Sequence, residues 1–294
     1  MSTYFTILYR LTKADVLERT RRYSFFVTMV ATLYVGYSAY AGNIVLRLGN
    51  YRGVYNSAWV GMLMALSVVT IYTIAGFYIV KNAVERDELT RVGQILAATR
   101  ISNFTYILSK LFSNAFILMS ITGIMFVAGF AMQLGKSESG AFNLPALLLP
   151  FLLIALPAMF LTAGIALLFE NISWLRGGFG NVFFIFFWAT SIALPIENDM
   201  PAFDLTGLSL VRPQMQEAVR SKDPNYKDSF GLNIGPEGQT KDLKPVVWNG
   251  MQWTPWIIFT RLSWFAWTLL LAVISSLLFR RFDRALPKKK LSPA

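Results

Sequence analysis

Five carboxylates in one polar segment are the residues best suited by type to acid–base or metal chemistry. They are Glu197, Asp199, Asp204, Glu217 and Asp223. Acid–base catalysis needs titratable groups within hydrogen-bond reach of a substrate, and a metal ion needs several ligands that converge. The spacing of these five is diagnostic of neither. We interpret the segment as a solvated acidic loop that balances its own lysines, and the competing interpretation is a membrane-embedded hydrolase or transferase.

The chain lacks residues that other common chemistries require. No GxxxxGK[ST] loop occurs, and the run Gly177-Gly178-Phe179-Gly180 has no lysine, so we interpret it as helix packing or flexibility. Because histidine and cysteine are both absent, only methionine and carboxylates remain as metal ligands. We therefore expect a chain that is not an enzyme and that holds no metal or cofactor of its own.

A polar island at residues 81–100 (KNAVERDELTRVGQILAATR) separates two long apolar runs. Acids and bases are concentrated between Glu85 and Arg91, where they present a helix to something outside the lipid. Asn82 can cap this helix, with Glu85 three residues later. We predict a helix over residues 82–98 that contacts a soluble partner.

The island also carries apolar residues that lie on or beside one face of such a helix: Leu89, Val92, Ile95 and Leu96. Gly93 lowers helix propensity, so it either marks the close approach of another surface or indicates a short helix. After the island, Ser102 and Asn103 can cap the next membrane helix. The alternative to a docking helix is a solvated connector.

The composition places the chain in a lipid bilayer. Its 294 residues are 55% hydrophobic and 15% aromatic, and its mean hydropathy is +0.48, which exceeds what a soluble domain of this length would expose or bury. A membrane-spanning helix needs about 20 mostly apolar residues. We predict an all-α membrane protein with six such helices, at residues 23–42, 58–80, 111–134, 144–169, 177–196 and 257–279.

Two of the predicted spans have features of their own. In the fourth, Pro145 suits a helix start, whereas Pro150 and Pro157 should bend or break the helix. In the sixth, Pro255 stands near the start. The outer half of the sixth span carries an aromatic belt typical of a membrane surface, formed by Trp253, Trp256, Trp264 and Trp267.

Arg261 is the only charged residue within the predicted spans. Carriers driven by protons or ions usually place ionisable groups at depth, as relays or binding sites. The scarcity of such groups, together with the lack of histidine, disfavours a secondary transporter.

The positive charges indicate how the chain sits in the membrane. Seventeen of the 27 Lys and Arg residues fall within residues 1–22, 81–110, 170–176 and 280–294. Positive charge in short segments marks the cytoplasmic side, whereas a long segment such as residues 196–261 counts little. We predict a multi-pass protein of the cell (plasma) membrane with both termini and the polar island in the cytoplasm. The basic tail suits an anionic inner leaflet, and basic residues that flank spans form no groove for nucleic acid.

The N-terminal segment, residues 1–22, is predicted to be an amphipathic interfacial helix. Its apolar residues recur at helical spacing beside basic ones: Phe5, Leu8 and Leu11. The helix is a simple membrane anchor, or its residues 15–22 also touch a cytoplasmic partner.

The extracellular segment between the fifth and sixth spans, residues 196–256, has no cysteine. It must therefore fold by packing or against the membrane. A short amphipathic helix is expected at about residues 208–219, where Pro213 fits only near a start or a kink.

The fifth predicted span is rich in aromatic residues. Rings that face all round a helix cannot all line one path, so lipid contact and helix packing explain most of them. The alternative is a hydrophobic lateral or central route for an amphipathic substrate, with contacts to the substrate or to a second subunit from Phe183, Phe184, Phe187 and Trp188.

The chain resembles the ABC-2 type permeases, the membrane subunits of ATP-binding cassette (ABC) exporters. The likeness lies in six spans with both ends inside, in the block ERDELTRVGQILAATRISNFTYILSK at residues 85–110, and in a large outer segment before the sixth span. The closing sequence at residues 248–283, WNGMQWTPWIIFTRLSWFAWTLLLAVISSLLFRRFD, is similar to the endings of bacterial permeases of this group. These loose patterns cover most of the chain, and none is a catalytic signature.

The resemblance implies a mechanism and partners. In such permeases the block after the second span is a coupling helix that docks into a cleft on the ATPase subunit. The family implies a dimer with itself or a similar chain, cytoplasmic ABC ATPase subunits that hold ATP and Mg²⁺, and export of a hydrophobic or amphipathic substrate such as a peptide, a lipid-linked molecule or a drug. Carried over by position, the docking residues are Glu85, Arg86, Asp87, Glu88, Leu89, Thr90, Arg91 and Gly93.

The competing interpretation, from a different functional class, is an ATP-independent membrane sensor or structural subunit. Its polar island would also dock a cytoplasmic protein, so the island alone does not separate the two classes. An adjacent gene for a chain with a GxxxxGK[ST] loop would favour the transporter.

Overall fold

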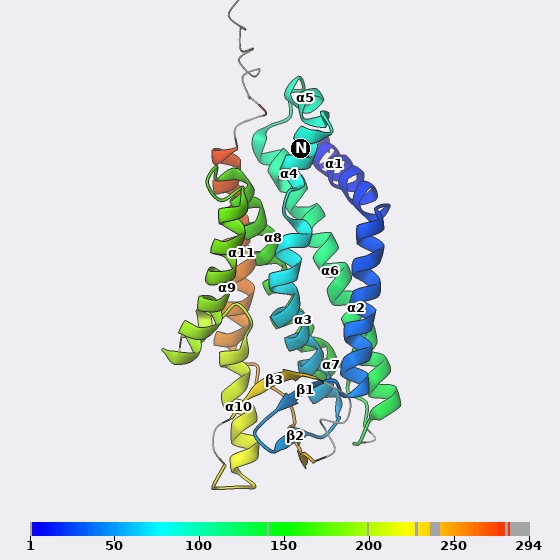
Figure 1. The fold of residues 1–294 in the computed structure, drawn as a ribbon, viewed down its shortest axis with the longest axis vertical. Helices are drawn as coiled ribbons and strands as arrows, with labels where there is room; N and C mark the ends of the chain where they lie inside the picture. The colour runs from blue at the N-terminus through cyan, green and yellow to red at the C-terminus, as the bar shows by residue number, and fades with distance from the viewer. Residues whose placement is uncertain are drawn as a thin grey trace, which may run out of the picture.

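The computed structural model describes residues 2–139, 141–198, 200–226, 229–235, 242–279 and 282. Within these residues six helices are long and apolar enough to cross a membrane, which confirms the predicted number. They run along the long axis of the molecule as a bundle (Figure 1). The spans contain α2 (Tyr23–Ala41), α3 (Ser57–Val80), α6 (Asn103–Lys136), α7 (Leu144–Pro150) followed by α8 (Leu156–Asn171), α9 (Gly178–Glu197) and α11 (Pro255–Leu278).

Helix α3 forms the centre of the bundle and packs against α6, α7 and α8. It is apolar all round and buried over most of its length, as expected for a helix covered on every side. Its start is defined by Asn56, whose side-chain oxygen accepts a hydrogen bond from the Trp59 N–H at 2.8 Å. This cap satisfies one of the free donors of the first turn.

The fourth span is irregular near its prolines, as predicted. Pro145 lies in the first turn of α7 and Pro157 in the first turn of α8. Between these helices, Phe151–Ala155 forms a π-helical turn. Pro157 has no N–H to donate to the preceding turn, and a π turn accommodates such a missing hydrogen bond without breaking the span.

The polar island differs from the single capped helix that the sequence predicts. It forms α4 (Ala83–Leu89) and α5 (Val92–Ala97), separated at Thr90 and Arg91. Asn82 has a left-handed φ of 71° and its side chain makes no capping hydrogen bond, so the predicted Asn82 cap is wrong. The free N–H groups at the start of α4 are bound instead by a carboxylate from α8, described below.

Helix α6 begins eight residues before the predicted span. The predicted Ser102 cap is confirmed, because its hydroxyl accepts a hydrogen bond from the Thr105 N–H at 3.1 Å. The 34 residues of α6 extend about 51 Å at the usual rise per residue, well beyond a hydrocarbon core of about 30 Å. Its polar first turns therefore project past the apolar part of the bundle.

The end of the bundle opposite the island contains short strands, which corrects the all-α prediction (Figure 1). Strand β1 (Ile44–Arg47) pairs antiparallel with β3 (Gly231–Ile234), with Ile44 opposite Ile234. Strand β2 (Tyr51–Gly53) pairs in parallel with β4 (Lys244–Val246). The segment after the fifth span thus folds by packing onto the loop between the first two spans.

The remainder of this outer segment contains the predicted short helix, observed as α10 (Leu208–Arg220), with Pro213 inside it. Before it, Pro201–Phe203 forms a 3-10 turn. Asp204 follows and is fully buried. Its carboxylate accepts hydrogen bonds from the backbone and hydroxyl groups of Thr206 and Ser209.

Arg261 joins the sixth span to this outer segment. Its guanidinium is fully buried and donates to the carbonyl oxygens of Asp204 at 2.8 Å and Pro201 at 2.9 Å. It also lies 4.6 Å from the centre of the Trp264 ring. The predicted belt is therefore divided. Trp264 is buried against the outer segment, Trp253 packs partly buried against the core, and only Trp256 and Trp267 are exposed as a belt requires.

The N-terminal segment forms α1 (Ser2–Thr20), so the predicted helix is present. Its apolar residues divide between two faces, because Phe5 is exposed while Leu8 and Leu11 are half-buried. The most buried side chains of α1 are charged, Asp15 and Arg19. They point into the interior of the bundle at the island's end.

Replacing Gly61 should destabilise the bundle. A Cβ at this position would lie 2.5 Å from the carbonyl oxygen of Leu147, because the backbones of α3 and α7 meet there. We expect Gly61→Ala to lower the free energy of unfolding by about 1–3 kcal/mol. Gly123→Ala is the matched control, since nothing lies within 4 Å of its Cβ. Thermal unfolding in detergent measures both, and equal stability of the two variants would contradict this packing.

Candidate partner-docking site

The polar island lies at one end of the bundle, beyond the apolar parts of the spans (Figure 1). The first helix α1 and the last turn of α11 lie at the same end, while α10 and the strands lie at the other (Figure 1). The described parts of the N-terminal and C-terminal regions therefore flank α4 and α5. The site is built from the contacts that hold these two short helices and from the face that they leave free.

The start of α4 is held by Glu170, near the end of α8. Its buried carboxylate accepts hydrogen bonds from the N–H groups of Ala83 at 2.9 Å and Val84 at 2.6 Å. A carboxylate in this position satisfies free donors and complements the positive end of the helix. Further along α4, Glu88 forms an ion pair of 2.8 Å with Arg176, just after α8. Helices α4 and α8 are thus joined at two points.

A buried ionic cluster joins α4 to α6 and α1. Lys110 of α6 lies between two carboxylates, with its Nζ 2.7 Å from Asp15 Oδ1 and 2.8 Å from Asp87 Oδ2. Asp87 also accepts a hydrogen bond of 2.7 Å from the Tyr106 hydroxyl, and Asp15 is paired with Arg19 at 3.0 Å. All five side chains are buried. Each acid in the cluster has a basic partner, as buried charges require.

Asp15 lies outside the predicted spans, and the pKa of its carboxyl depends on two opposing effects, burial and the neighbouring positive charges. Burial alone would raise the pKa of its carboxyl. The charges of Arg19 and Lys110, with the hydrogen bond from Lys110, more than offset burial and hold the pKa of Asp15 below its ordinary value. The cluster therefore keeps this carboxylate charged.

The opposite face of the island is exposed. Leu89 has 78% of its surface exposed and Ile95 has 69%, and Val92 is also open. Thr90 and Arg91 form the exposed turn between the helices. We call Leu89, Thr90, Arg91, Val92 and Ile95 the outer face of the island. It is a small exposed surface that is mostly apolar, with one positive charge, on helices whose other side is held by α6 and α8.

The eight predicted docking residues differ in exposure. Three are exposed: Leu89, Thr90 and Arg91. Three are half-buried, Glu85, Arg86 and Glu88, and two are buried, Asp87 and Gly93. The buried pair therefore positions the island in the isolated chain. Sequence reasoning left Val92 and Ile95 out of the docking set, although their place on an apolar face was recognised. It also missed Glu170 and Arg176, whose only signal was charge close to the end of a helix, and it considered Asp15 only as part of a segment that touches a partner.

The aromatic residues of α9 do not form one surface. Phe184 is buried and stacks on Phe77 with ring centres 3.5 Å apart, and the Trp188 indole donates a hydrogen bond of 2.7 Å to the Thr73 hydroxyl. These two hold α9 against α3. Phe183 and Phe187 are partly exposed on the outside of the bundle. Of the predicted contact residues, only this outward pair is open to a substrate or a second subunit.

The candidate acids of the outer segment are dispersed. Asp204 is occupied by local hydrogen bonds, and Asp223 accepts one of 2.9 Å from the Tyr51 hydroxyl. Asp199 lies outside the described residues. Across the described part of the chain, no group of three or more acids could hold a metal ion.

The glycine run at the start of α9 has a packing role at one position. A Cβ on Gly180 would lie 1.8 Å from the Leu175 carbonyl oxygen, whereas Gly177 and Gly178 have open space. The close approach lets the chain turn directly from the loop into α9.

Comparison with known proteins finds no matching family model, no similar curated protein and no similar solved structure.

Proposed function

We propose that this chain is a transmembrane permease subunit of an ABC exporter. In this proposal the chain dimerises to form the translocation pathway, and its island docks on a cytoplasmic ATPase subunit that holds ATP and Mg²⁺. The observation that carries the proposal is the outer face of the island. An exposed apolar surface on helices fixed by α1, α6 and α8 suits a protein partner better than solvent.

The contacts that hold the island would transmit its movement to the membrane-spanning helices. ATP binding would draw two ATPase subunits together and move the islands docked on them. Because Glu170 joins α4 to α8 and Lys110 joins it to α6, a displacement of α4 would be passed to two spans rather than absorbed locally. The spans would then shift between inward-open and outward-open states, each stabilised by its contacts with the nucleotide-bound or nucleotide-free partner.

The proposal also includes an orientation in the membrane and a class of substrate. The positive charges favour a cytoplasmic island and termini in a cell membrane, with α1 at the inner interface. Hydrophobic or amphipathic molecules, such as a peptide, a lipid-linked molecule or a drug, fit the apolar spans best. The outward rings Phe183 and Phe187 are the candidate contacts with such a substrate or with the second subunit.

Co-purification with the ABC ATPase encoded beside this chain tests the proposal. We expect a stable complex whose ATP hydrolysis exceeds that of the ATPase alone. Glu88→Ala removes the ion pair with Arg176 and should lower this stimulation severalfold, with Glu85→Ala as a companion variant. Failure to form a complex with any such ATPase would contradict the permease assignment and favour the sensor or structural subunit. A stable complex with unchanged turnover in both variants would contradict only the roles of these two residues.

A further inference from the structure

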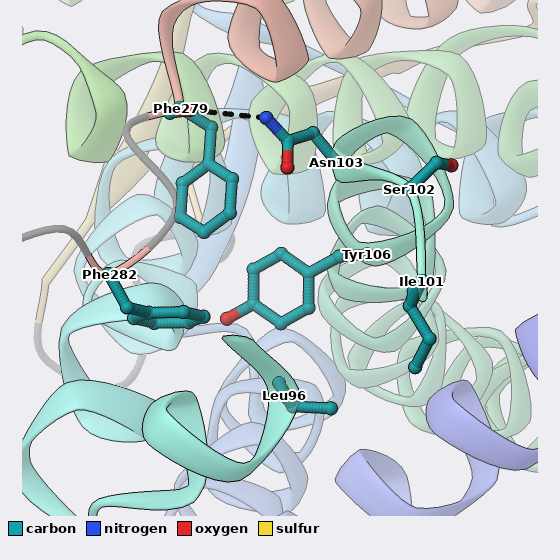
Figure 2. Close-up of a pocket in the computed structure, with 7 residues that line it drawn as sticks. All are labelled: Leu96, Ile101, Ser102, Asn103, Tyr106, Phe279 and Phe282. Atoms are coloured by element: carbon teal, nitrogen blue, oxygen red, sulfur yellow. Dashed lines mark hydrogen bonds between the residues drawn. The ribbon is translucent and has the colours of Figure 1, made fainter. Parts of the chain in front are cut away.

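Two phenylalanines beyond the last turn of α11 pack against Tyr106 of α6, and the second, Phe282, also meets Gly93 of the island. Phe279 stacks on Tyr106 of α6 with ring centres 5.1 Å apart, and Phe282 meets the edge of the same ring at 5.6 Å. The two phenylalanine rings are 5.2 Å apart and nearly perpendicular. Figure 2 shows the three rings turned toward one another beside α5.

The rings line one side of a small hollow between α5 and α6 (Figure 2). Its volume is about 10 Å³, which is at or below the space that one water molecule needs. The contact is therefore closely packed. The lining residues are Leu96, Ile101, Ser102, Asn103, Tyr106, Phe279 and Phe282.

The Phe282 ring packs directly against the backbone of Gly93 in α5. A Cβ at Gly93 would lie 2.6 Å from two atoms of the Phe282 ring, so no larger residue fits without displacing the ring. Phe282 itself has a left-handed φ of 49°. Such a conformation is unfavourable for a bulky side chain and persists where the surrounding packing holds it.

The cluster connects to the groups that fix α4. The Tyr106 hydroxyl donates to Asp87 of α4, and the Asn103 side chain donates to the Phe279 carbonyl oxygen at 3.3 Å. The end of α11 is thus attached to α6 directly, to α5 through Gly93, and to α4 through Tyr106. Residues of the outer face are not part of this cluster.

We infer that Phe282 is a positioning residue that ties the sixth span to the polar island. By filling the space at Gly93, it makes α5 and the end of α11 move together, so that displacement of a docked island reaches the sixth span. This inference rests on the proposed function. It adds a third connection, beside those to α6 and α8, and assigns it to the segment after the last span.

Phe282→Ala should weaken coupling without weakening docking. We expect affinity for the ATPase to stay within about twofold, because every side chain of the outer face is unchanged, while stimulation of ATP hydrolysis falls about tenfold. Phe282→Tyr keeps the ring and should retain most of the stimulation. Loss of affinity and stimulation together, or full stimulation in Phe282→Ala, would overturn the inference.

A second measurement on the chain alone is independent of the ATPase. Hydrogen exchange at the amides of residues 92–97 should be about tenfold faster in Phe282→Ala than in the unmodified chain, because α5 loses its support. Unchanged exchange would overturn the inference even if the proposed function holds. Faster exchange in a chain that binds no ABC ATPase would instead contradict the proposed function while confirming the contact.

A disulfide can replace the ring, because the chain contains no cysteine of its own. The Gly93 Cβ position lies 3.0 Å from Phe282 Cγ, a separation compatible with a bridge between Gly93→Cys and Phe282→Cys. The reduced double variant should show low stimulation, and oxidation should restore it. Failure of the bridge to form, or oxidation without recovery, would overturn the inference.

Discussion

Replacing Ile95 with aspartate should strongly weaken association with the proposed ABC ATPase partner. Ile95 is 69% exposed, so the substitution leaves the fold of the chain intact. In the docked state the same side chain would be buried at the centre of an apolar contact, where an unpaired carboxylate is costly. A central interface residue of this kind contributes about 2 kcal/mol or more, equivalent to a loss of affinity of roughly 30-fold. Binding of the purified ATPase to the chain in detergent or nanodiscs measures the effect.

Ile234→Asp provides the matched control. Ile234 is the same residue type with 65% exposure, but it lies in β3 at the opposite end of the bundle. We expect its affinity for the ATPase to be unchanged. Equal affinities of the Ile95 and Ile234 variants would show that the outer face is not the docking surface.

Replacing Lys110 with methionine should have the largest effect on stability. The lysine lies between Asp15 and Asp87, and all three side chains are buried. Removal of the central charge leaves Asp87 with only the Tyr106 hydroxyl and leaves Asp15 with only Arg19. Loss of one partner from a buried ion pair typically costs about 3–5 kcal/mol. We therefore expect a fall of this size in the free energy of unfolding, measured by denaturant titration in mixed micelles.

Two controls separate this effect from a general loss of charge. Arg22→Met removes one partner of the exposed pair with Glu18 and should cost less than about 1 kcal/mol. Combining Lys110→Met with Asp87→Asn removes the carboxylate left without a basic partner, while Asp15 keeps its pair with Arg19, and should recover part of the lost stability. A Lys110 variant as stable as the Arg22 variant would contradict the cluster as the support of the island.

The spans could be predicted from the sequence because their signal is local. Each needs a run of about 20 apolar residues, and six such runs became six helices. The Ser102 cap was predictable for the same reason, since donor and acceptor are three residues apart. Pro145 at the start of the fourth span is a further local signal that was confirmed.

The errors occur where a distant residue decides the local structure. Asn82 fits a cap by type, but Glu170, far along the chain, binds the N–H groups that Asn82 was expected to satisfy. The strand pair of Ile44 and Ile234 joins segments on either side of four spans. Neither segment carries a strand pattern long enough to predict this pairing.

The charges near the island illustrate the same limit. Lys110 and Arg176 were counted as part of the positive charge that sets orientation, which is a statement about the whole chain. The structure shows that each also has a particular acidic partner in α4. Charge counting contains no information about pairing, so the sequence located the island but not the contacts that fix it.

Site-specific cross-linking from the outer face tests the central claim most directly. Because the natural chain has no cysteine, a single Ile95→Cys can carry a photoactivatable maleimide in the complex with the ABC ATPase. The docking account predicts a light-dependent covalent adduct between this chain and the ATPase, and none from Ile234→Cys. An intact complex in which the Ile95 probe reacts only with lipid or solvent would contradict docking through the polar island.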